Sequence, residues 1–512
     1  MSTQPKPANP LKAVRGTRDL LPPETALWNR VESVARAVFS RYGFGEIRTP
    51  IFEDTQLFAR GVGEETDIVS KEMYTWEDRA RAQSEKAQSL TLRPENTAGV
   101  VRAYIEHKLD ARGDLQKLYY IGPQFRRERP QRGRYRQFWQ IGAEVLGPVS
   151  SGSESPLRDA EVLEMLASLL DELGIRGWQL ALNSVGSSDD RKRYNAALRE
   201  ALAPVKAQMC EDNQRRAETN PLRVLDSKEP ADQAIIDALP KIADYLDEAS
   251  RAHFSAVLAA LDACGVPYTV NPRLVRGLDY YTRTTFEFTV PSSDQAGSGL
   301  GTQNALLGGG RYDGLSEMLG GPRAPGIGFA IGEDRLILTL QAQAAAEQSG
   351  VPHSSQSHRD GWAAGVPHSS QSHRDGWAAG VPHSSQSHRD GWAAPKLDAG
   401  VPHSSQSHRD GWAAPKLDAY IAPMGAERNA AALALARELR RAGLSVEVGD
   451  GTFRLKKSFE AADKVARNIV ILGEDEVARN VATVKTFATG EQVKVALAEL
   501  QSRLRQTQEP RP

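Results

Sequence analysis

The sequence predicts an α+β fold, with an antiparallel sheet in a large first domain and a smaller α/β domain after it. Strand-like segments cluster between residues 116 and 340, whereas strands and helices alternate over 419–505. The chain of 512 residues, 40% of them hydrophobic and 25% charged, is long enough for about three domains. We therefore divide it into 1–340, 341–418 and 419–512.

The first elements follow from hydrophobic spacing. Residues 24–41 carry apolar side chains at helical intervals, and Gly43 follows as a stop signal. The segments 45–53 and 89–95 are each typical of a strand, and 97–109 of a helix. Aromatic and β-branched residues then alternate on both sides of an arginine-rich bend over 117–147, which predicts two antiparallel strands joined by a loop.

The rest of the large domain reads as helix, helical insertion and further strands. Residues 159–173 predict an amphipathic helix, and 185–268 is charged and mostly helical, so we take it as an inserted module. Strand patterns resume in 279–290, and 307–315 and 326–340 follow them.

A repeat separates the two domains. The unit VPHSSQSHRDGWAAG begins at residue 351 and returns at 366, 381 and 401. The surrounding Ser, Gln, Gly and Pro supply no rigid shell for its His-x4-His pairs, so we expect a disordered linker over 351–418 and no metal site. We also expect that deleting it leaves activity intact.

Charge and cysteine usage exclude several classes of protein. The net charge of −1 argues against a strongly basic nucleic-acid binder, although a local basic patch stays possible. Cys210 and Cys264 stand far apart and form no CxxC motif, which excludes a disulfide framework. No apolar run is long enough to span a membrane and the first residues lack a secretory pattern, so we expect a cytoplasmic protein without membrane contact.

The densest chemical feature is an arginine cluster. Six of the eleven residues over 126–136 are arginine, namely Arg126, Arg127, Arg129, Arg132, Arg134 and Arg136. Guanidinium groups match phosphate oxygens, and the interleaved aromatic residues would anchor the strands. A solvated charged loop is the alternative, but binding of a polyanion, either ATP or RNA, fits better.

Two glycine clusters follow, and neither matches a standard nucleotide loop. Gly308–Gly310 lack the Lys-Ser/Thr of a Walker loop, and the glycines over 326–332 miss the dinucleotide fingerprint. Either cluster alone is also compatible with a turn or with tight packing.

A third set is acidic, amide and aromatic. Because residues four apart on a strand share a face, Gln140 and Glu144 are expected to point into one pocket. Glu95 and the pair Tyr280 and Tyr281, which follow Arg276 closely, complete the set. Structural ion pairs are the alternative for each acidic residue taken alone.

Taken together, these segments resemble the histidyl-tRNA synthetases, a family of class II aminoacyl-tRNA synthetases. The segments GFGEIRTPIFE, FRRERPQRGRYRQF and GIGFAIGEDRL are similar to the three class II motifs. LVRGLDYYTRTTFEF and GGGRYDGL resemble two segments peculiar to the histidine-specific members. The resemblance implies a class II catalytic domain over 1–340, a linker over 341–418 and an anticodon-binding domain over 419–512.

That resemblance implies the reaction and its participants. Histidine and ATP would form histidyl-adenylate and pyrophosphate, and the histidyl group would then pass to the cognate tRNA(His), with release of AMP. Mg²⁺ on the phosphates and a homodimer are also implied, and we expect no metal ion held by the protein itself.

The resemblance also implies roles for individual residues. Arg126 and Arg335 would clamp the triphosphate together with Arg134, Glu128 would lie near the adenine amino group, and Arg276 would contact the α-phosphate and the histidine carboxylate. The catalytic set is thus Arg276, Arg126 and Arg335, and the nucleotide-binding set is Arg126, Glu128, Arg134 and Arg335. The histidine-binding set is Glu95, Asn96, Thr97, Arg126, Gln140, Glu144, Arg276, Tyr280 and Tyr281.

Within the pocket, Glu95, Thr97 and Gln140 suit an ammonium group, while Glu144 and Tyr281 suit the imidazole nitrogens. Two departures from the family pattern stand in this sequence. Asn96 replaces an expected glycine, and Trp139 stands where histidine is common.

Two other readings use the same residues. One is a regulatory subunit of ATP phosphoribosyltransferase, which shares this fold but usually lacks the last domain and the motif arginines. The other is an RNA-binding protein that uses the arginine-rich loop alone, which would leave the pocket without a purpose. Histidine-dependent ATP–pyrophosphate exchange separates all three.

Overall fold

The computed structural model describes residues 11–63, 66–78, 87–278, 280–290, 304–348 and 416–507. The linker prediction for 351–418 falls outside these residues except at its end, where Leu417 and Asp418 belong to a strand and not to a linker. The described residues up to 348 and from 416 onward belong to one compact unit. None of the helices in these parts of the chain combines the length and the apolarity that a membrane crossing needs.

An eight-stranded sheet forms the centre of the larger part. Its order is β1-β5-β6-β11-β10-β9-β7-β8, and the six inner strands pair antiparallel, whereas β1 and β8 pair parallel at the edges. The predicted antiparallel sheet is therefore confirmed. In chain order the strands are β1 Gly45–Glu46, β5 Gln116–Phe125, β6 Gln137–Leu146, β7 Gln179–Ser184, β8 Thr269–Val270, β9 Thr282–Thr289, β10 Ala305–Arg311 and β11 Gly326–Gly332.

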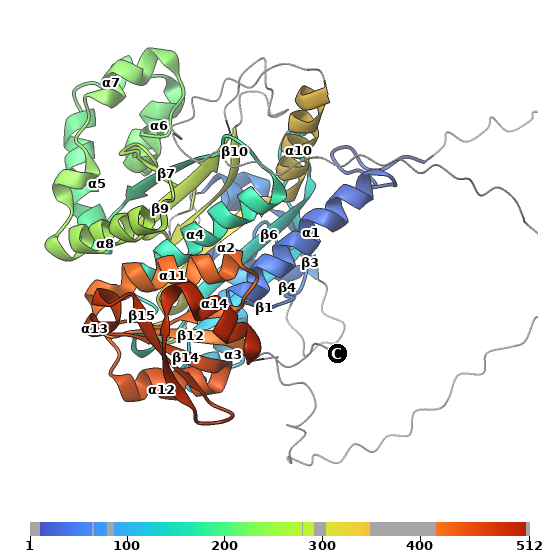
Figure 1. The fold of residues 1–512 in the computed structure, drawn as a ribbon. Helices are drawn as coiled ribbons and strands as arrows, with labels where there is room; N and C mark the ends of the chain where they lie inside the picture. The colour runs from blue at the N-terminus through green and yellow to red at the C-terminus, as the bar shows by residue number, and fades with distance from the viewer. Residues whose placement is uncertain are drawn as a thin grey trace, which may run out of the picture. The chain divides into compact units, whose positions relative to one another are not determined.

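Helices cover one face of this sheet. In Figure 1, α1 (Glu24–Arg41) and α4 (Pro156–Leu173) cross the strands, with α8 (Glu248–Cys264) beside α4. The alternation along β6 explains the layering: Ile141, Ala143 and Val145 join the core under these helices. The residues between them face the other side of the sheet, where a cavity lies. α10 (Glu333–Gln348) follows β11 directly and extends eight residues beyond the predicted domain end at 340.

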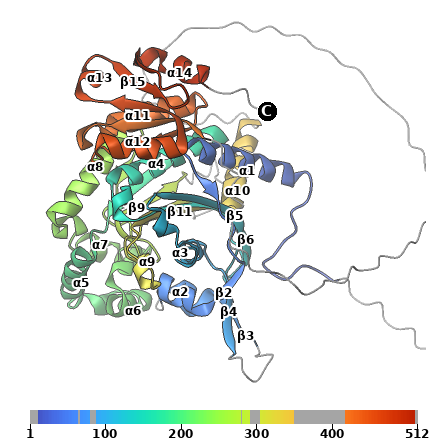
Figure 2. The ribbon, with the colours of Figure 1, turned by 90° about the horizontal axis from the view of Figure 1, so that it is seen from below.

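The segment 45–53 is not one strand, as predicted, but two short strands in different sheets. β1 pairs with β5, whereas β2 (Phe52–Asp54) pairs with β4 (Gln88–Leu92), which also pairs with β3 (Tyr74–Asp78). Pro50 lies between them and has no N–H to donate to a ladder, which explains the interruption. The small sheet lies beside α2 (Thr55–Val62) and extends away from the larger one (Figure 2).

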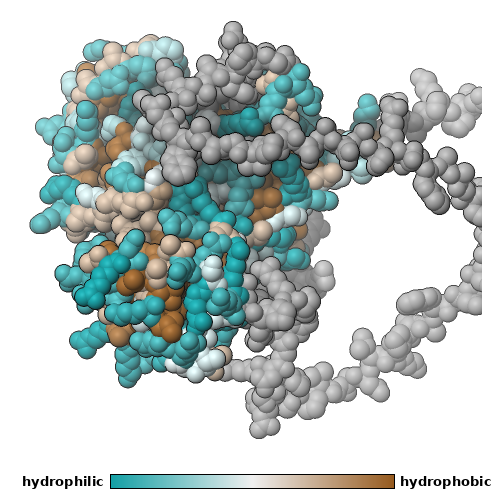
Figure 3. Space-filling view, viewed as in Figure 1, coloured by the Kyte–Doolittle hydropathy of each residue, from teal (hydrophilic) through white to brown (hydrophobic). Residues whose placement is uncertain are grey.

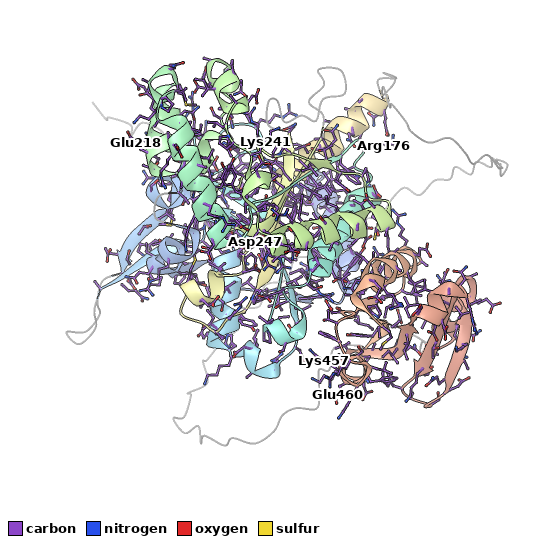
Figure 4. The ribbon with its side chains drawn as sticks, turned by 90° about the vertical axis from the view of Figure 1, so that its left-hand side faces the viewer. Arg176, Glu218, Lys241, Asp247, Lys457 and Glu460 are labelled. Atoms are coloured by element: carbon purple, nitrogen blue, oxygen red, sulfur yellow. The ribbon has the colours of Figure 1, made fainter. Side chains whose placement is uncertain are left out.

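The insertion is helical, as predicted, but its last helix belongs to the main core. α5 (Ser188–Leu202), α6 (Glu211–Thr219) and α7 (Gln233–Asp237) surround a separate cluster that includes Tyr194, Val224 and Ile236. In contrast, α8 buries Val257 and Leu261 in the cluster that contains α4. Figure 4 shows Glu218 at the outer edge of the insertion and Asp247 where α8 begins.

The C-terminal part forms a second sheet of order β13-β12-β14-β15-β16. The predicted alternation of strands and helices is confirmed, except that two strands rather than one precede the final helix. The elements are β12 Leu417–Pro423, α11 Asn429–Arg441, β13 Val446–Val448, α12 Leu455–Val465, β14 Ala466–Leu472, α13 Glu474–Ala478, β15 Val481–Thr486, β16 Gln492–Ala496 and α14 Leu497–Gln506. On the face seen in Figure 3, hydrophilic side chains alternate with small apolar patches, as is usual for a globular chain.

A buried ionic cluster links α4 to α11. Glu161 accepts from Arg440 at 2.6 Å and pairs with Lys117 and Arg158, each at 2.9 Å. Although burial opposes ionisation, these three cations hold the pKa of Glu161 below its usual range. Removing one partner would leave buried charges uncompensated, so the cluster fixes these two helices relative to each other.

Candidate active site

A cavity of about 250 Å³ opens on the face of the large sheet opposite α1 and α4. Its wall combines the ends of β5, β6, β9, β10 and β11 with the start of α3 (Thr97–Glu106). Ten of the twelve predicted site residues line it: Glu95, Thr97, Arg126, Glu128, Arg134, Gln140, Arg276, Tyr280, Tyr281 and Arg335. The other two, Asn96 and Glu144, do not line the cavity.

Glu95 caps the helix that begins at the cavity. Its carboxylate accepts from the backbone N–H groups of Thr97 at 2.7 Å and Ala98 at 3.1 Å. Burial raises the pKa of Glu95, while these two N–H groups oppose the rise. Each carboxylate oxygen keeps a further lone pair, so the group can accept from a ligand as well.

Glu144 lies directly behind the cavity wall. It is fully buried, and its oxygens accept from the hydroxyls of Tyr312 at 2.6 Å, Thr97 at 2.7 Å and Tyr120 at 3.4 Å. All three hydroxyl-bearing residues line the cavity. Burial raises the pKa of Glu144 to about 8, because desolvation of the carboxylate outweighs these hydrogen bonds.

Neither departure from the family pattern faces the cavity. Asn96 accepts from the hydroxyl of Thr49 at 2.5 Å and from Arg93 at 3.4 Å, so its side chain points toward the segment before β2. The backbone N–H of Trp139 donates to Asp334 at 3.1 Å, and its ring packs against the main core. Both residues thus hold the structure around the site.

The loop between β5 and β6 presents arginines beside one carboxylate. Glu128 lies between Arg126, 3.9 Å away, and Arg134, 3.3 Å away. The guanidinium of Arg126 also donates to the carbonyl of Pro94 at 2.9 Å and lies over the ring of Phe138. Gly133 turns the loop with φ = +74°, a conformation that favours glycine.

Arg335 enters the same space from the first turn of α10. It donates to the carbonyl of Ala305 at 3.0 Å. Burial lowers the pKa of its guanidinium, and the neighbouring charges of Arg134 and Arg126 lower it further. Mutual repulsion of this kind indicates a site in which an anion would stabilise the arginines.

Arg276 lies on the segment before β9 and lines the same cavity. Its guanidinium donates to Glu287 at 3.0 Å. A Cβ at Gly308 would lie 2.5 Å from Nη1 of Arg276, so a larger residue there would require the guanidinium to move. Tyr281 packs over Gly310 in the same way, because a Cβ on Gly310 would lie 2.8 Å from its ring. The glycine cluster lies within β10, where it permits close packing.

Among the cavity residues that were not predicted from the sequence, three contact predicted ones. Tyr120 and Tyr312 hold Glu144, and Glu287 pairs with Arg276. Alternation along 282–289 could have placed Glu287 on the cavity face, because it stands one residue from Phe286 and Phe288 in the core. Tyr120 stands likewise in the alternating pattern of β5.

Both parts of the chain are similar to known protein families. A family model described as histidyl-tRNA synthetase matches residues 16–336. A second model, described as anticodon binding domain, matches residues 418–507. The two matches leave the segment that contains the repeat between them.

Individual proteins are similar over nearly the full length. A histidine–tRNA ligase of Koribacter versatilis is 62% identical, covering 96% of this chain and 95% of its own. A histidine–tRNA ligase of Bacillus subtilis is 41% identical, and the match covers 95% of this chain and 96% of that protein. The crystal structure of the apo histidyl-tRNA synthetase of S. aureus matches with a TM-score of 0.51 and 33% sequence identity. The match covers 96% of this chain and 99% of that chain.

Proposed function

Because the chain belongs to the histidyl-tRNA synthetase family, with its class II catalytic fold, we propose that histidine and ATP react in the cavity on the large sheet. The chain charges tRNA with histidine in two steps and consumes ATP. First a carboxylate oxygen of histidine attacks the α-phosphorus and pyrophosphate leaves. A ribose hydroxyl of the tRNA then attacks the carbonyl of histidyl-adenylate, and AMP leaves.

The gathering of four arginines in one cavity carries this assignment. Arg126, Arg134, Arg276 and Arg335 all line the cavity. Such a set suits a triphosphate, because guanidinium groups bind phosphate oxygens in pairs and keep their charge when buried. We assign Arg126, Arg134 and Arg335 to the triphosphate and Glu128 to the adenine amino group.

Arg276 is assigned to the α-phosphate and the histidine carboxylate. Negative charge grows on the phosphate oxygens as the carboxylate attacks, and a fixed guanidinium stabilises it without moving. Its contact with Glu287 holds it in place before substrates bind. This arginine, with Arg126 and Arg335, makes up the proposed catalytic set.

The histidine ammonium is assigned to Glu95, with Thr97 and Gln140. Gln140 supports this role because its buried Oε1 has no hydrogen-bond partner among the described residues. The imidazole is assigned to the part of the cavity near Tyr280 and Tyr281. Glu144 lies behind the cavity wall there. The hydroxyls of Tyr312, Thr97 and Tyr120 donate to Glu144, and because these three residues line the cavity they link that buried carboxyl to a bound ring.

Magnesium fits this cavity as a companion of the nucleotide. No group of three or more His, Cys, Asp or Glu side chains clusters as a metal site in the described ranges. Mg²⁺ is commonly held by one or two carboxylates together with substrate phosphates, and Glu287 and Glu128 are suitable residues in the wall. When bound, it would neutralise charge on the phosphates.

The residues over 418–507 are proposed to bind the anticodon of tRNA(His). The matching family model supports this role, and Arg454, Lys456 and Lys457 near the start of α12 offer phosphate contacts. Lys457 and Glu460 lie on this helix in Figure 4.

A homodimer is proposed through the small sheet. Ile51, Phe52 and Trp76 are 45%, 53% and 40% exposed, and the last two rings touch edge to face. Large apolar side chains gathered on an exposed sheet favour a second copy of the chain as partner. Sedimentation of the purified chain and of Phe52→Glu tests this surface.

We also propose the cytoplasm as the compartment. Both cysteines are free thiols, which agrees with that compartment.

Histidine-dependent ATP–pyrophosphate exchange, run with each of the twenty amino acids, tests the proposal. Exchange with histidine alone is expected, because an analogue that lacks the polar ring leaves the hydrogen-bonding groups around the buried Glu144 without that partner. A regulatory subunit or a purely RNA-binding protein would show none. Exchange that is supported equally by another amino acid would refute the assignment of the pocket.

A further inference from the structure

The segment between β8 and β9 has two sides with different neighbours. On one side Arg276, Tyr280 and Tyr281 line the cavity. On the other side Arg273 and Val275 contact the helical insertion. A segment that touches both the reacting groups and a separate module can transmit the position of one to the other.

Arg273 makes the principal contacts with the insertion. Its guanidinium donates to Asp237 at 2.9 Å and to Gln233 at 2.8 Å, and more weakly to the carbonyls of Leu225 and Ser227, both at 3.4 Å. A single exposed ion pair stabilises little, since solvent screens it. Four acceptors around one planar guanidinium, however, fix its orientation.

Two further contacts strengthen the same attachment. Val275 packs against the insertion's own apolar cluster. The guanidinium of Arg223 lies 2.8 Å from where a Cβ on Gly277 would stand. The insertion therefore contacts residues 273, 275 and 277, which surround Arg276.

On the sheet side, Asn183 holds the same segment. Its buried side-chain amide donates to the carbonyls of Leu274 at 3.0 Å and Pro272 at 3.3 Å. The segment is thus held by β7 on one side and by the insertion on the other. Arg273 makes the main contacts with the insertion.

We propose that Arg273 is a positioning residue for adenylate formation. By tying the segment to the insertion, it sets where the guanidinium of Arg276 stands relative to the α-phosphate. The proposal rests on the proposed role of Arg276. Displacement of a reacting group by about 1 Å can slow a reaction ~10²-fold, so a partial loss of this anchor is expected to be measurable.

The experiment measures the single-turnover rate of histidyl-adenylate formation in the full chain. Arg273→Ala is expected to slow it about 10-fold with saturating substrates. In an Arg276→Ala background the same change is expected to slow it less than ~2-fold, because the residue acts through Arg276. Glu218→Ala, which removes a partner of Lys206 at the outer edge of the insertion (Figure 4), serves as the control and should leave the rate unchanged.

The outcomes are distinct. Equal losses from Arg273→Ala in both backgrounds, or no loss in either, overturn the positioning role. A defect confined to transfer onto tRNA overturns it as well. If Arg273→Ala does not fold, Asp237→Ala and Gln233→Ala each remove one acceptor and must slow adenylation in its place. A near-normal rate for Arg276→Ala alone would instead refute the proposed function of that arginine.

Discussion

The guanidinium of Arg276 occupies the space that a side chain on Gly308 would fill, with Nη1 2.5 Å from the position of that absent Cβ. Two segments that resemble the histidine-specific members of the family thus meet at one contact. The glycine has no chemistry of its own here, and its lack of a side chain is what places the arginine.

Gly308→Ala is expected to displace Arg276 and to slow adenylate formation at least ~10-fold, with little change in the KM for histidine. Single-turnover kinetics check this. Gly314→Ala is the matched control, because nothing lies within 4 Å of its Cβ position. Equal rates for the two variants would contradict the packing argument.

Tyr312→Phe removes the hydroxyl that donates to Glu144 at 2.6 Å. We expect the KM for histidine to rise about 10-fold, because loss of a hydrogen bond to a buried polar group is typically worth ~1–2 kcal/mol. The KM for ATP should not change. Tyr104→Phe is the control, since the buried Tyr104 hydroxyl has no hydrogen-bond partner among the described residues. A higher KM in both variants would point to packing and not to Glu144.

Glu333 is expected to destabilise the folded chain in a way that depends on pH, so that its replacement raises the stability. Its buried carboxylate has no hydrogen-bond partner in the described part of the chain, and burial, with Glu32 and Asp334 nearby, raises its pKa to about 9. Between its ordinary pKa and about 9 the folded chain binds the proton and the unfolded chain does not, so this group makes stability fall as the pH rises.

Glu333→Gln should therefore raise the melting temperature at pH 8, by about 1 °C if the gain is about 1 kcal/mol, because the shift per kcal/mol falls with chain length. Below about pH 4 the carboxyl is largely neutral in both the folded and the unfolded chain, and the gain should vanish. Thermal unfolding across this range measures it. A gain that does not depend on pH would show that ionisation of Glu333 has no part in stability.

The folded architecture was largely predictable, because it follows from patterns within single segments. The alternation over 117–147 gave two strands and their loop, and the helix over 24–41 ended before Gly43 as predicted. What the sequence did not disclose depends on partners far along the chain. Residues 45–53 divide between two sheets because their first part pairs with β5 and their last part with β4. α8 joins the main core because α4 lies beside it.

The same limit applied to the cavity. Motif spacing placed Glu95, Gln140 and Arg276 in one wall, but nothing local indicated that Asn96 would turn toward Thr49. Glu287 was missed because a single carboxylate in a strand usually faces solvent. Its role emerges only from the salt bridge with Arg276.

The rate of histidyl-adenylate formation by Arg276→Ala tests the central assignment most directly. Loss of a preorganised donor at the charged transition state predicts a fall of at least ~10²-fold. Arg132→Ala, an exposed arginine of the same cluster that does not line the cavity, should stay within ~2-fold of the unaltered chain. Near-normal adenylation by Arg276→Ala in a folded protein would contradict the account.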